Sequence, residues 1–481
     1  MSKTSQSHFG LRQLAEQVQK KEISVASLVT RRLGKASQSE SVFISLNHDI
    51  VGQAQAIDKL IDQAIQSGKP LSPLSGLPIT LKDLFDVRGE ITLAGSRVLK
   101  NIAKPAAQDC AVIAPLRNAG LLFLGRTNMS EFAFSGMGLN PHYGNPQSIW
   151  DRATGRLSGG SSSGSAVSVA EGIVAASMGS DTAGSCRIPA AFNGIVGVKP
   201  SYGRYSLAGV YPLSPTSDAP GPLAADLDSC FILDQVITGA YSGAGALPEA
   251  QRLERSNLSL LVPESVVLED LDDRVKASFE RALGWLEQAG AAIKHRPMPV
   301  IDRCIDMFFK RSIVGYEAWQ HHQSLIQHYG DEYDPFVRQR LENSRQVTER
   351  EQQSRYREKA GLQRDFNRVM QQQQGDGLIY PTVACVPPTM AEAMAPPKMN
   401  GSAKINLRCL RNTAAANYFN GCSISLPCHR PGDAPVGLMV SLSHNQDDYL
   451  YRVAATVEKI LNDRRVSRGC LPSNPVSALR Y

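Results

Sequence analysis

Apolar residues recur at helical spacing through the first part of the chain. Over residues 11–33 they follow one face of a helix, with a break near Glu22, which predicts two short helices. Residues 51–65 carry the same amphipathic pattern and predict a third helix. We expect these N-terminal helices to form scaffold.

After residue 76 the pattern alternates between short apolar runs and helical segments. Residues 77–83 have the short apolar run of a buried strand, and residues 110–120 predict a helix that ends at its glycine. A strand is expected at residues 121–127, followed by a helix that starts at Asn128. Further alternation, strands and a closing helix are expected at residues 165–200, 277–297, 377–388, 422–428, 436–442 and 448–463. The pattern predicts an α/β fold, one large domain with a central mixed β-sheet covered by helices on both faces.

Composition changes this picture little. Hydrophobic residues make up 42% and charged residues 20% of the 481 residues, as in an ordinary globular protein. A net charge of +6, from 51 basic and 45 acidic side chains, is too dilute to predict a nucleic-acid partner. The most basic stretch, residues 345–368, alternates in sign and is typical of a solvated helix face.

Cysteine usage and the N-terminus bear on location and cofactors. The nine cysteines are odd in number and scattered, without metal-ligand spacing, so we expect neither a disulfide framework nor a metal or other cofactor. The N-terminus lacks the apolar stretch of a signal peptide, and no apolar run reaches the about 18 residues of a membrane span. We therefore expect a cytoplasmic protein without a membrane partner.

Two short loops rich in glycine and serine stand out at residues 159–165 (GGSSSGS) and 179–185 (GSDTAGS). Between them lies a segment of small and apolar residues, which a flexible linker would not contain. We therefore expect both loops to be held rigidly against a core.

Several kinds of site compete for the first loop. A phosphate-binding loop needs a lysine after its second glycine, whereas Gly164 is followed by Ser165. A GxSxG nucleophile elbow centred on Ser162 needs a strand directly before it, and the preceding residues look like a loop. No serine stands three positions before a lysine, so the SxxK motif is absent. A serine activated by lysine without histidine remains.

The motifs also resemble those of the amidase signature family. That family's glycine-serine loops, GGSS(G/S)GS and GSDTxGSxRxPA, and its strand GxPxxxKD match residues 159–165, 179–190 and 76–83. The resemblance implies the amidase signature fold and hydrolysis of a carboxamide C–N bond, without a cofactor. It also implies that Ser185 is the nucleophile, Lys82 the base, and Ser161 a bridging serine that lies before a cis peptide bond.

These roles make physical demands on the lysine. Lys82 can remove a proton only as a neutral amine, and burial lowers the pKa of a lysine because it disfavours the cation. Asp83 is expected to point away from it, because neighbouring side chains of a strand face opposite sides. Ser161 would relay the proton from Ser185 to Lys82 and return it to the leaving nitrogen, so that an acyl-enzyme forms and ammonia or an amine departs.

By the same resemblance, backbone amides of the turn form an oxyanion hole. The residues concerned are Thr182, Ala183 and Gly184, together with Ser185 itself. Many family members have glycine where this chain has Ala183, whose methyl group would lie near the reacting carbonyl. Asp181 and Arg187 flank the turn with opposite charges and are expected to brace it.

The resemblance also divides the chain and suggests a pocket. It implies one amidase domain over residues 1–481, with N-terminal helices at 1–70, a catalytic core at 71–220 and a variable, substrate-specificity region at 300–375. Met137 and Gly138 are expected near the substrate. The variable region is rich in aromatic residues, which are more often core than pocket: Phe308, Phe309, Tyr316, Trp319, Tyr329, Tyr333 and Phe336.

Three functions stay open on the sequence. The first is an amidohydrolase that acts on a small-molecule amide, as a monomer or a homodimer. The second is the glutaminase component of a tRNA-dependent amidotransferase, and the third is a catalytically inactive binding protein. Filled catalytic positions at Lys82, Ser161 and Ser185 argue against the third.

Overall fold

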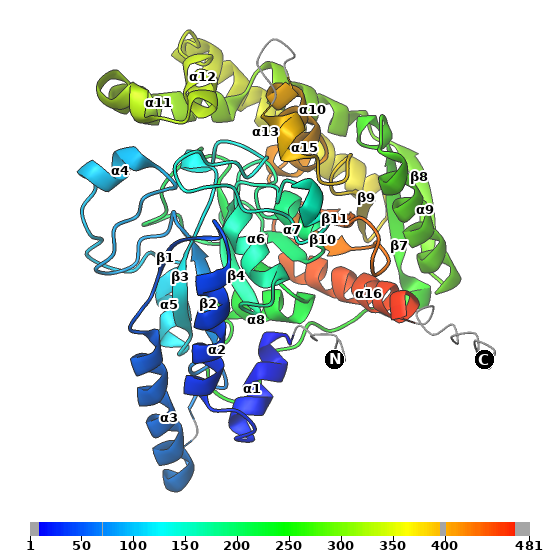
Figure 1. Ribbon diagram of the computed structural model, residues 1–481. Helices are drawn as coiled ribbons and strands as arrows, with labels where there is room; N and C mark the ends of the chain where they lie inside the picture. The colour runs from blue at the N-terminus through cyan, green and yellow to red at the C-terminus, as the bar shows by residue number, and fades with distance from the viewer. Residues whose placement is uncertain (1–8, 70, 395–400, 467–481) are drawn as a thin grey trace, which may run out of the picture.

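A mixed β-sheet of 11 strands runs through the molecule (Figure 1). The computed structural model describes residues 9–69, 71–394 and 401–466. Across the sheet the strand order is β1-β3-β2-β4-β6-β5-β10-β11-β9-β7-β8. The strands are β1 (Phe43–Leu46), β2 (Pro78–Lys82), β3 (Leu122–Thr127), β4 (Ala176–Asp181), β5 (Val196–Lys199), β6 (Ala219–Ala224), β7 (Ser259–Glu264), β8 (Ala292–Pro297), β9 (Gly377–Pro381), β10 (Cys422–Pro427) and β11 (Gly437–Leu442).

Two parallel groups of strands flank an antiparallel middle. Strand β2 runs parallel to β3 and β4, and β7 runs parallel to β8 and β9. Strands β6, β5, β10 and β11 pair antiparallel between these groups. Every residue of β2, β3 and β4 is buried, which explains why their sequences are continuous runs rather than an alternation.

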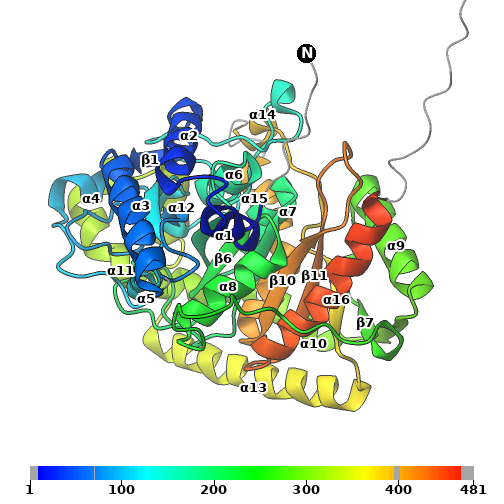
Figure 2. The same ribbon diagram turned by 90° about the horizontal axis from the view of Figure 1, so that it is seen from below.

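Helices lie on both faces of this sheet. Helix α8 packs on β5 and β6 and α16 on β10 and β11, whereas α6 and α7 pack on the opposite face (Figures 1 and 2). The predicted α/β fold with a mixed sheet covered on both faces is therefore confirmed. The helices are α1 (Leu11–Gln19), α2 (Val25–Gln38), α3 (Ile50–Ser67), α4 (Arg97–Ile102), α5 (Ile113–Asn118), α6 (Ser163–Ala170), α7 (Arg187–Asn193), α8 (Leu227–Ile237), α9 (Asp273–Gln288), α10 (Pro299–Lys310), α11 (Ile313–Tyr329), α12 (Pro335–Glu342), α13 (Glu349–Gln373), α14 (Met390–Ala393), α15 (Gly401–Tyr418) and α16 (Asp447–Val466).

The helix predicted to start at Asn128 does not form. The Asn128 side chain instead ties loops together, because its Nδ2 donates to the carbonyl oxygens of Ser41 (2.8 Å) and Gly144 (2.9 Å). An asparagine that bonds the backbone in this way competes with helix formation. The chain continues as a short 3-10 turn over Glu131–Ala133, in which Phe132 has a φ of 50°.

The parallel strands β2 and β4 bring two charged residues together at one end of the sheet. Lys82 ends β2 and Asp181 ends β4, and because the two strands are parallel their carboxyl ends lie side by side. The turn before α7 directly follows β4 at this end of the sheet, and the loop before α6 contacts that turn. Among the helices of the described ranges, none is long and apolar enough to cross a membrane.

Candidate active site

Lys82 lies buried at the end of β2. Its Nζ donates hydrogen bonds to the hydroxyl oxygens of Ser161 (2.7 Å) and Ser180 (2.8 Å). Burial lowers the pKa of Lys82 to about 7, against smaller opposing effects from Cys186 and from the carboxylates of Asp181 and Asp218. A lysine with this pKa is available as a neutral amine near neutral pH, which a general base requires.

Asp83 is held away from this lysine. Its carboxylate accepts hydrogen bonds from Arg126 Nε (3.1 Å) and from the backbone N–H of Gly95 (3.4 Å). Asp83 and Arg126 are both buried and form an ion pair. The geometry therefore agrees with the expected opposite orientation of neighbouring strand side chains.

The structure distinguishes the three consecutive serines of the first loop. Ser161 contacts Lys82, whereas the hydroxyl of Ser162 donates to the carbonyl of Ser180 (3.3 Å) and that of Ser163 to the carbonyl of Asn128 (3.3 Å). The peptide bond between Gly160 and Ser161 is cis, so the cis bond precedes Ser161 rather than following it as expected. Helix α6 starts at Ser163 without a strand directly before the loop, unlike a nucleophile elbow.

Ser185 lies in the turn between β4 and α7. The backbone N–H of Ser162 donates to the carbonyl oxygen of Ser185 (3.2 Å), so the two glycine-serine loops touch through their backbones. Among the described residues, Ser161 Oγ is bonded to Lys82 and not to Ser185 Oγ. Lys82, Ser161 and Ser185 thus gather at one end of the sheet, with the first two in direct contact.

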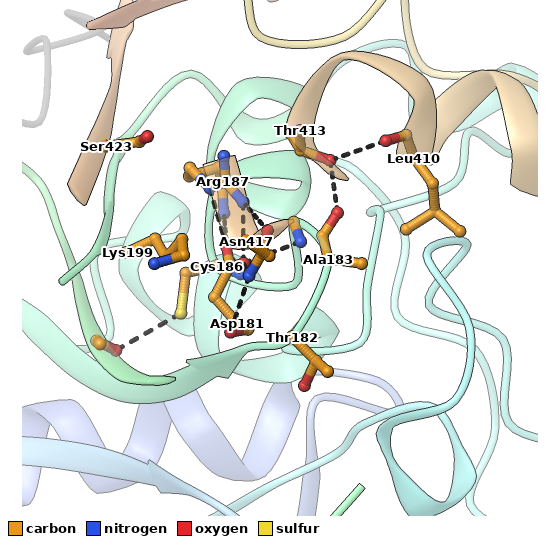
Figure 3. Close-up of polar contacts among 12 residues, drawn as sticks. Asp181, Thr182, Ala183, Cys186, Arg187, Lys199, Leu410, Thr413, Asn417 and Ser423 are labelled. Carbon is orange, nitrogen blue, oxygen red and sulfur yellow. Dashed lines mark hydrogen bonds and ion pairs between the residues drawn. The ribbon is translucent and has the colours of Figure 1, made fainter. Parts of the chain in front are cut away.

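A buried ion pair braces the turn (Figure 3). Arg187 donates to both carboxylate oxygens of Asp181, through Nη2 (2.8 Å) and Nε (3.0 Å), and both residues are fully buried. Asn417 Nδ2 adds a bond of 3.0 Å to Asp181. These contacts, led by the charge of Arg187, hold the pKa of Asp181 to about 2 despite burial. The expected bracing by Asp181 and Arg187 is present.

The same carboxylate orders the backbone amides of the turn. Asp181 accepts hydrogen bonds from the N–H groups of Gly184 (2.8 Å) and Cys186 (3.1 Å). The N–H groups of Thr182, Ala183 and Ser185 have no acceptor among the hydrogen bonds of the described residues. The amide of Gly184 is therefore occupied, whereas its three neighbours are available to a ligand.

Helix α15 supports the turn from outside. Thr413 Oγ1 donates to the carbonyl of Ala183 (2.6 Å), as Figure 3 shows. Gly184 has a φ of +133°, and a Cβ there would lie 2.1 Å from Thr413 Oγ1. Only glycine fits such a backbone conformation at such close approach. The peptide between Ala183 and Gly184 is thus fixed by Thr413 on one side and Asp181 on the other.

A cavity lies beside the Ser185 side chain. It is lined by Ala133, Phe134, Ser135, Gly136, Thr182, Ala183, Ser185, Leu213, Phe308, Ser312, Val314, Arg340 and Leu410. Ala183 is one of these lining residues. Of the seven aromatic residues singled out in the variable region, Phe308 is the one that lines the cavity.

Arg340 is the charged residue of this wall. Its guanidinium lies over the ring of Phe134, with Cζ 4.1 Å from the ring centroid, and Nη1 donates to the carbonyl of Phe134. Burial lowers the pKa of Arg340 to about 10, and no acidic side chain of the described residues opposes that effect. Arg340 is therefore a cation at neutral pH without a carboxylate partner in the described ranges.

Met137 and Gly138 are not among the residues that line the cavity. Met137 is buried against Leu157 and Ala393. Gly138 packs on the loop that carries Ser161, since a Cβ there would lie 2.3 Å from the carbonyl oxygen of Gly159. The adjoining residues 133–136 line the cavity. The predicted contact of Met137 and Gly138 with substrate stays a prediction.

Three residues of this site were not expected from the sequence. Ser180 is the second partner of Lys82, and its place on β4 beside β2 could have suggested it. Arg340 comes from a polar helix more than 150 positions from Ser185 along the chain, and no local signal marks it. Asp218 accepts a hydrogen bond from Thr182 Oγ1 (2.6 Å) and also went unnoticed. In the described ranges no three histidine, cysteine or acidic side chains are grouped to hold a metal ion.

Comparisons with known proteins extend over nearly the whole chain. The model of the family described as "Amidase" matches residues 26–450. The chain is similar to 2-amino-5-chloromuconic acid deaminase of Comamonas testosteroni, at 32% identity over 415 residues, which cover 85% of this chain and 86% of the relative. It is also similar to one of the subunits of the Glutamyl-tRNA(Gln) amidotransferase of Symbiobacterium thermophilum, at 29% identity over 91% of this chain and 93% of the relative. A solved structure titled "Crystal structure of amidase" matches with a TM-score of 0.80 at 27% identity, over 95% of this chain and 100% of that one.

Proposed function

The chain belongs to the amidase family, whose members are hydrolases of amide C–N bonds, and from that premise we propose that Ser185, Ser161 and Lys82 carry out the hydrolysis here. The observation that carries this assignment is the buried contact of 2.7 Å between Lys82 Nζ and Ser161 Oγ. It joins a lysine whose pKa is near neutrality to a serine beside the nucleophile turn. A buried lysine without a carboxylate in contact is otherwise costly.

In the proposed acylation, Lys82 takes a proton from Ser161 while Ser161 takes one from Ser185. Ser185 Oγ then bonds to the carbonyl carbon of the substrate and a tetrahedral intermediate forms. The hydroxyl of Ser185 is not bonded to that of Ser161 here, and the mechanism requires this hydrogen bond to form when substrate binds, as catalytic hydrogen bonds often do.

The same relay then serves the leaving group. An amide nitrogen is a poor leaving group until it is protonated. The proton passes from Lys82 through Ser161 to that nitrogen, the C–N bond breaks, and ammonia or an amine departs. Water, activated through the same pair, hydrolyses the acyl-enzyme to a carboxylic acid and frees Ser185.

The oxyanion of both steps would be held by backbone amides of the turn. The amides of Thr182, Ala183 and Ser185 are the candidates, because they have no acceptor among the described residues. Gly184, which was also expected to donate, already donates to Asp181 and would shape the turn instead. Each such donor contributes about 3 to 4 kcal/mol in a transition state.

The acyl half of the substrate is proposed to carry a carboxylate. Arg340 lines the cavity beside Ser185, and a partly buried guanidinium without an acidic partner among the described residues favours a bound anion. The relative from Comamonas testosteroni is named for an acid, which supports the same substrate class. A short dicarboxylic acid in which one carboxyl group is an amide fits both features.

A second candidate function is that of a component of an amidotransferase. The similarity to the amidotransferase protein of Symbiobacterium thermophilum spans 91% of this chain and favours it. In that case glutamine would be the amide, and ammonia would pass to a partner protein. Hydrolysis of simple amides by the purified chain alone would count against this candidate.

The test is a panel of amides with ammonia detection on the purified chain. Each monoamide of a short dicarboxylic acid is paired with an amide in which a methyl group replaces the carboxylate. We expect ammonia from the acidic member of each pair, and none from Ser185→Ala. Ammonia release that survives in Ser185→Ala, or equal rates within each pair, would refute the nucleophile or the substrate class respectively.

A further inference from the structure

Asp218 joins the proposed oxyanion turn to a second segment that lines the cavity. It lies directly before β6, across from the end of β4, and is 6% exposed. One carboxylate oxygen accepts the hydrogen bond from Thr182 Oγ1 (2.6 Å). The other accepts bonds from the N–H groups of Leu213 (2.9 Å) and Ser214 (3.0 Å). Because Leu213 and Thr182 both line the cavity, a single carboxylate sets the distance between two of its walls.

The loop that carries this carboxylate is held in turn by the variable region. Glu317 of α11 accepts hydrogen bonds from Ser214 Oγ (2.6 Å), from the N–H of Thr216 (3.2 Å) and from Thr216 Oγ1 (2.8 Å). Lys359 of α13 donates to the carbonyl of Thr216 (2.8 Å). Thus two charged side chains, from helices α11 and α13, hold the loop over residues 213–218 through hydrogen bonds.

These contacts form one connected path. Helices α11 and α13 bond to the loop, the loop bonds to Asp218, and Asp218 bonds to Thr182, whose amide is one of those available to a ligand. The turn is anchored by Asp181 and Thr413 on its other sides. Thr182 is therefore the point at which the variable region reaches the catalytic backbone.

We propose that Asp218 is a positioning residue of this hydrolase, which fixes the oxyanion turn through the Thr182 hydroxyl and links it to helices α11 and α13. This proposal rests on the proposed function, because it concerns the same nucleophile. The Asp218 carboxylate does not touch the reacting atoms. It holds the amides of Thr182 and Ala183 where the oxyanion develops, and a small displacement of such donors costs a large share of the rate.

The experiment measures how fast a small alkyl fluorophosphonate labels Ser185. The probe bonds to the serine oxygen with loss of fluoride, and its phosphonyl oxygen occupies the oxyanion site, so no knowledge of the natural substrate is needed. Thr182→Val removes the hydroxyl while keeping the shape of the side chain. Asp218→Asn removes the carboxylate charge, and the double variant completes a thermodynamic cycle.

Thr382→Val is the matched control, because it removes a buried threonine hydroxyl that bonds to Ser425 (2.8 Å) and lies outside the turn. We expect the maximal labelling rate of Thr182→Val to fall about 10- to 100-fold, with probe affinity nearly unchanged. The double variant should be no slower than the slower single variant, and Thr382→Val should label like the parent chain.

Three outcomes decide the matter. A Thr182→Val chain that labels at the parental rate would overturn the positioning role while leaving the nucleophile intact. Fully additive losses in the double variant would overturn the link between Asp218 and Thr182. If the probe does not label Ser185 in the parent chain, the proposed function is refuted, and the positioning role with it.

Discussion

Two arginines near Ser185, the proposed nucleophile, are used in opposite ways: Arg187 is fully buried and Arg340 is partly exposed. Arg187, next to the turn, donates hydrogen bonds to the side chains of Asp181 and Asn417. Arg340, in the cavity wall from α12, has the rings of Phe134 and Phe336 and a carbonyl oxygen as partners but no carboxylate among the described residues. The charge of Arg187 is neutralised by Asp181, and this ion pair holds the backbone of the turn in place. The charge of Arg340 remains available, which is what recognition of a charged substrate needs.

The largest effect is expected at the base, which serves both regions. Lys82→Met should lower kcat by about 1,000-fold or more for every amide, acidic or neutral, because the serine loses its proton acceptor. Steady-state kinetics near pH 8 measure it, with circular dichroism to confirm folding. Turnover within a few-fold of the parent chain would remove Lys82 from the mechanism.

The next effect separates the two arginines by stability. Arg187→Met leaves Asp181 buried without its cation, which costs about 3 to 5 kcal/mol in the free energy of unfolding. Arg340→Met loses one hydrogen bond and the cation–π contacts with two rings, all at a partly exposed site, so it should cost about 1 kcal/mol. Urea unfolding of the two variants measures both losses. Equal losses would break the contrast between a structural and an available arginine.

The third effect separates them by substrate. Arg340→Met should reduce kcat/KM about 10- to 100-fold for an acidic amide and leave the matched neutral amide nearly unchanged. Arg340→Lys should recover part of the loss. Arg338→Met on the same helix is the control, because Arg338 pairs with Asp331 and Glu342 at the surface. A loss shared equally by acidic and neutral amides would show that Arg340 only supports Phe134.

The last prediction concerns pH, and its smallest part is the displacement of the acid limb by a substitution. If Lys82 acts as a neutral amine, as proposed, kcat/KM should fall about tenfold for each pH unit below about 7, the value to which burial lowers its pKa, and level off above it. Asp181 and Asp218 both raise the pKa of Lys82, so Asp218→Asn should move this limb to lower pH. Arg340→Met should leave it in place. A rate that stays constant between pH 5 and pH 9 would contradict a lysine base.

Features that depend on residues close together in the sequence could be predicted, whereas contacts between residues far apart along the chain could not. Buried apolar runs on β2, β3 and β4 and the glycine-serine loops are local patterns, and they led to the mixed sheet and to the loops around Ser161 and Ser185. Asn128 misled because its side chain bonds to loops distant in sequence. Arg340 is bonded to Phe134, 206 positions away, and Asp218 to Thr182, 36 positions away, and no single-sequence pattern encodes such distances.

The choice among the three serines shows the same limit. Sequence spacing could not separate Ser161 from Ser162 and Ser163 without the family resemblance. The distinction arises only when β2 brings Lys82 beside the loop and leaves the other two hydroxyls bonded to backbone carbonyls.

The central claim is that Ser185 carries the acyl group during turnover. The direct measurement is a rapid acid quench of the chain reacting with an ester analogue of the acidic amide, followed by peptide mass mapping. Acylation of the peptide that contains Ser185, with no adduct in Ser185→Ala, is the predicted result. Product formation in a burst without any adduct on Ser185, or with the adduct on another residue, would contradict the account.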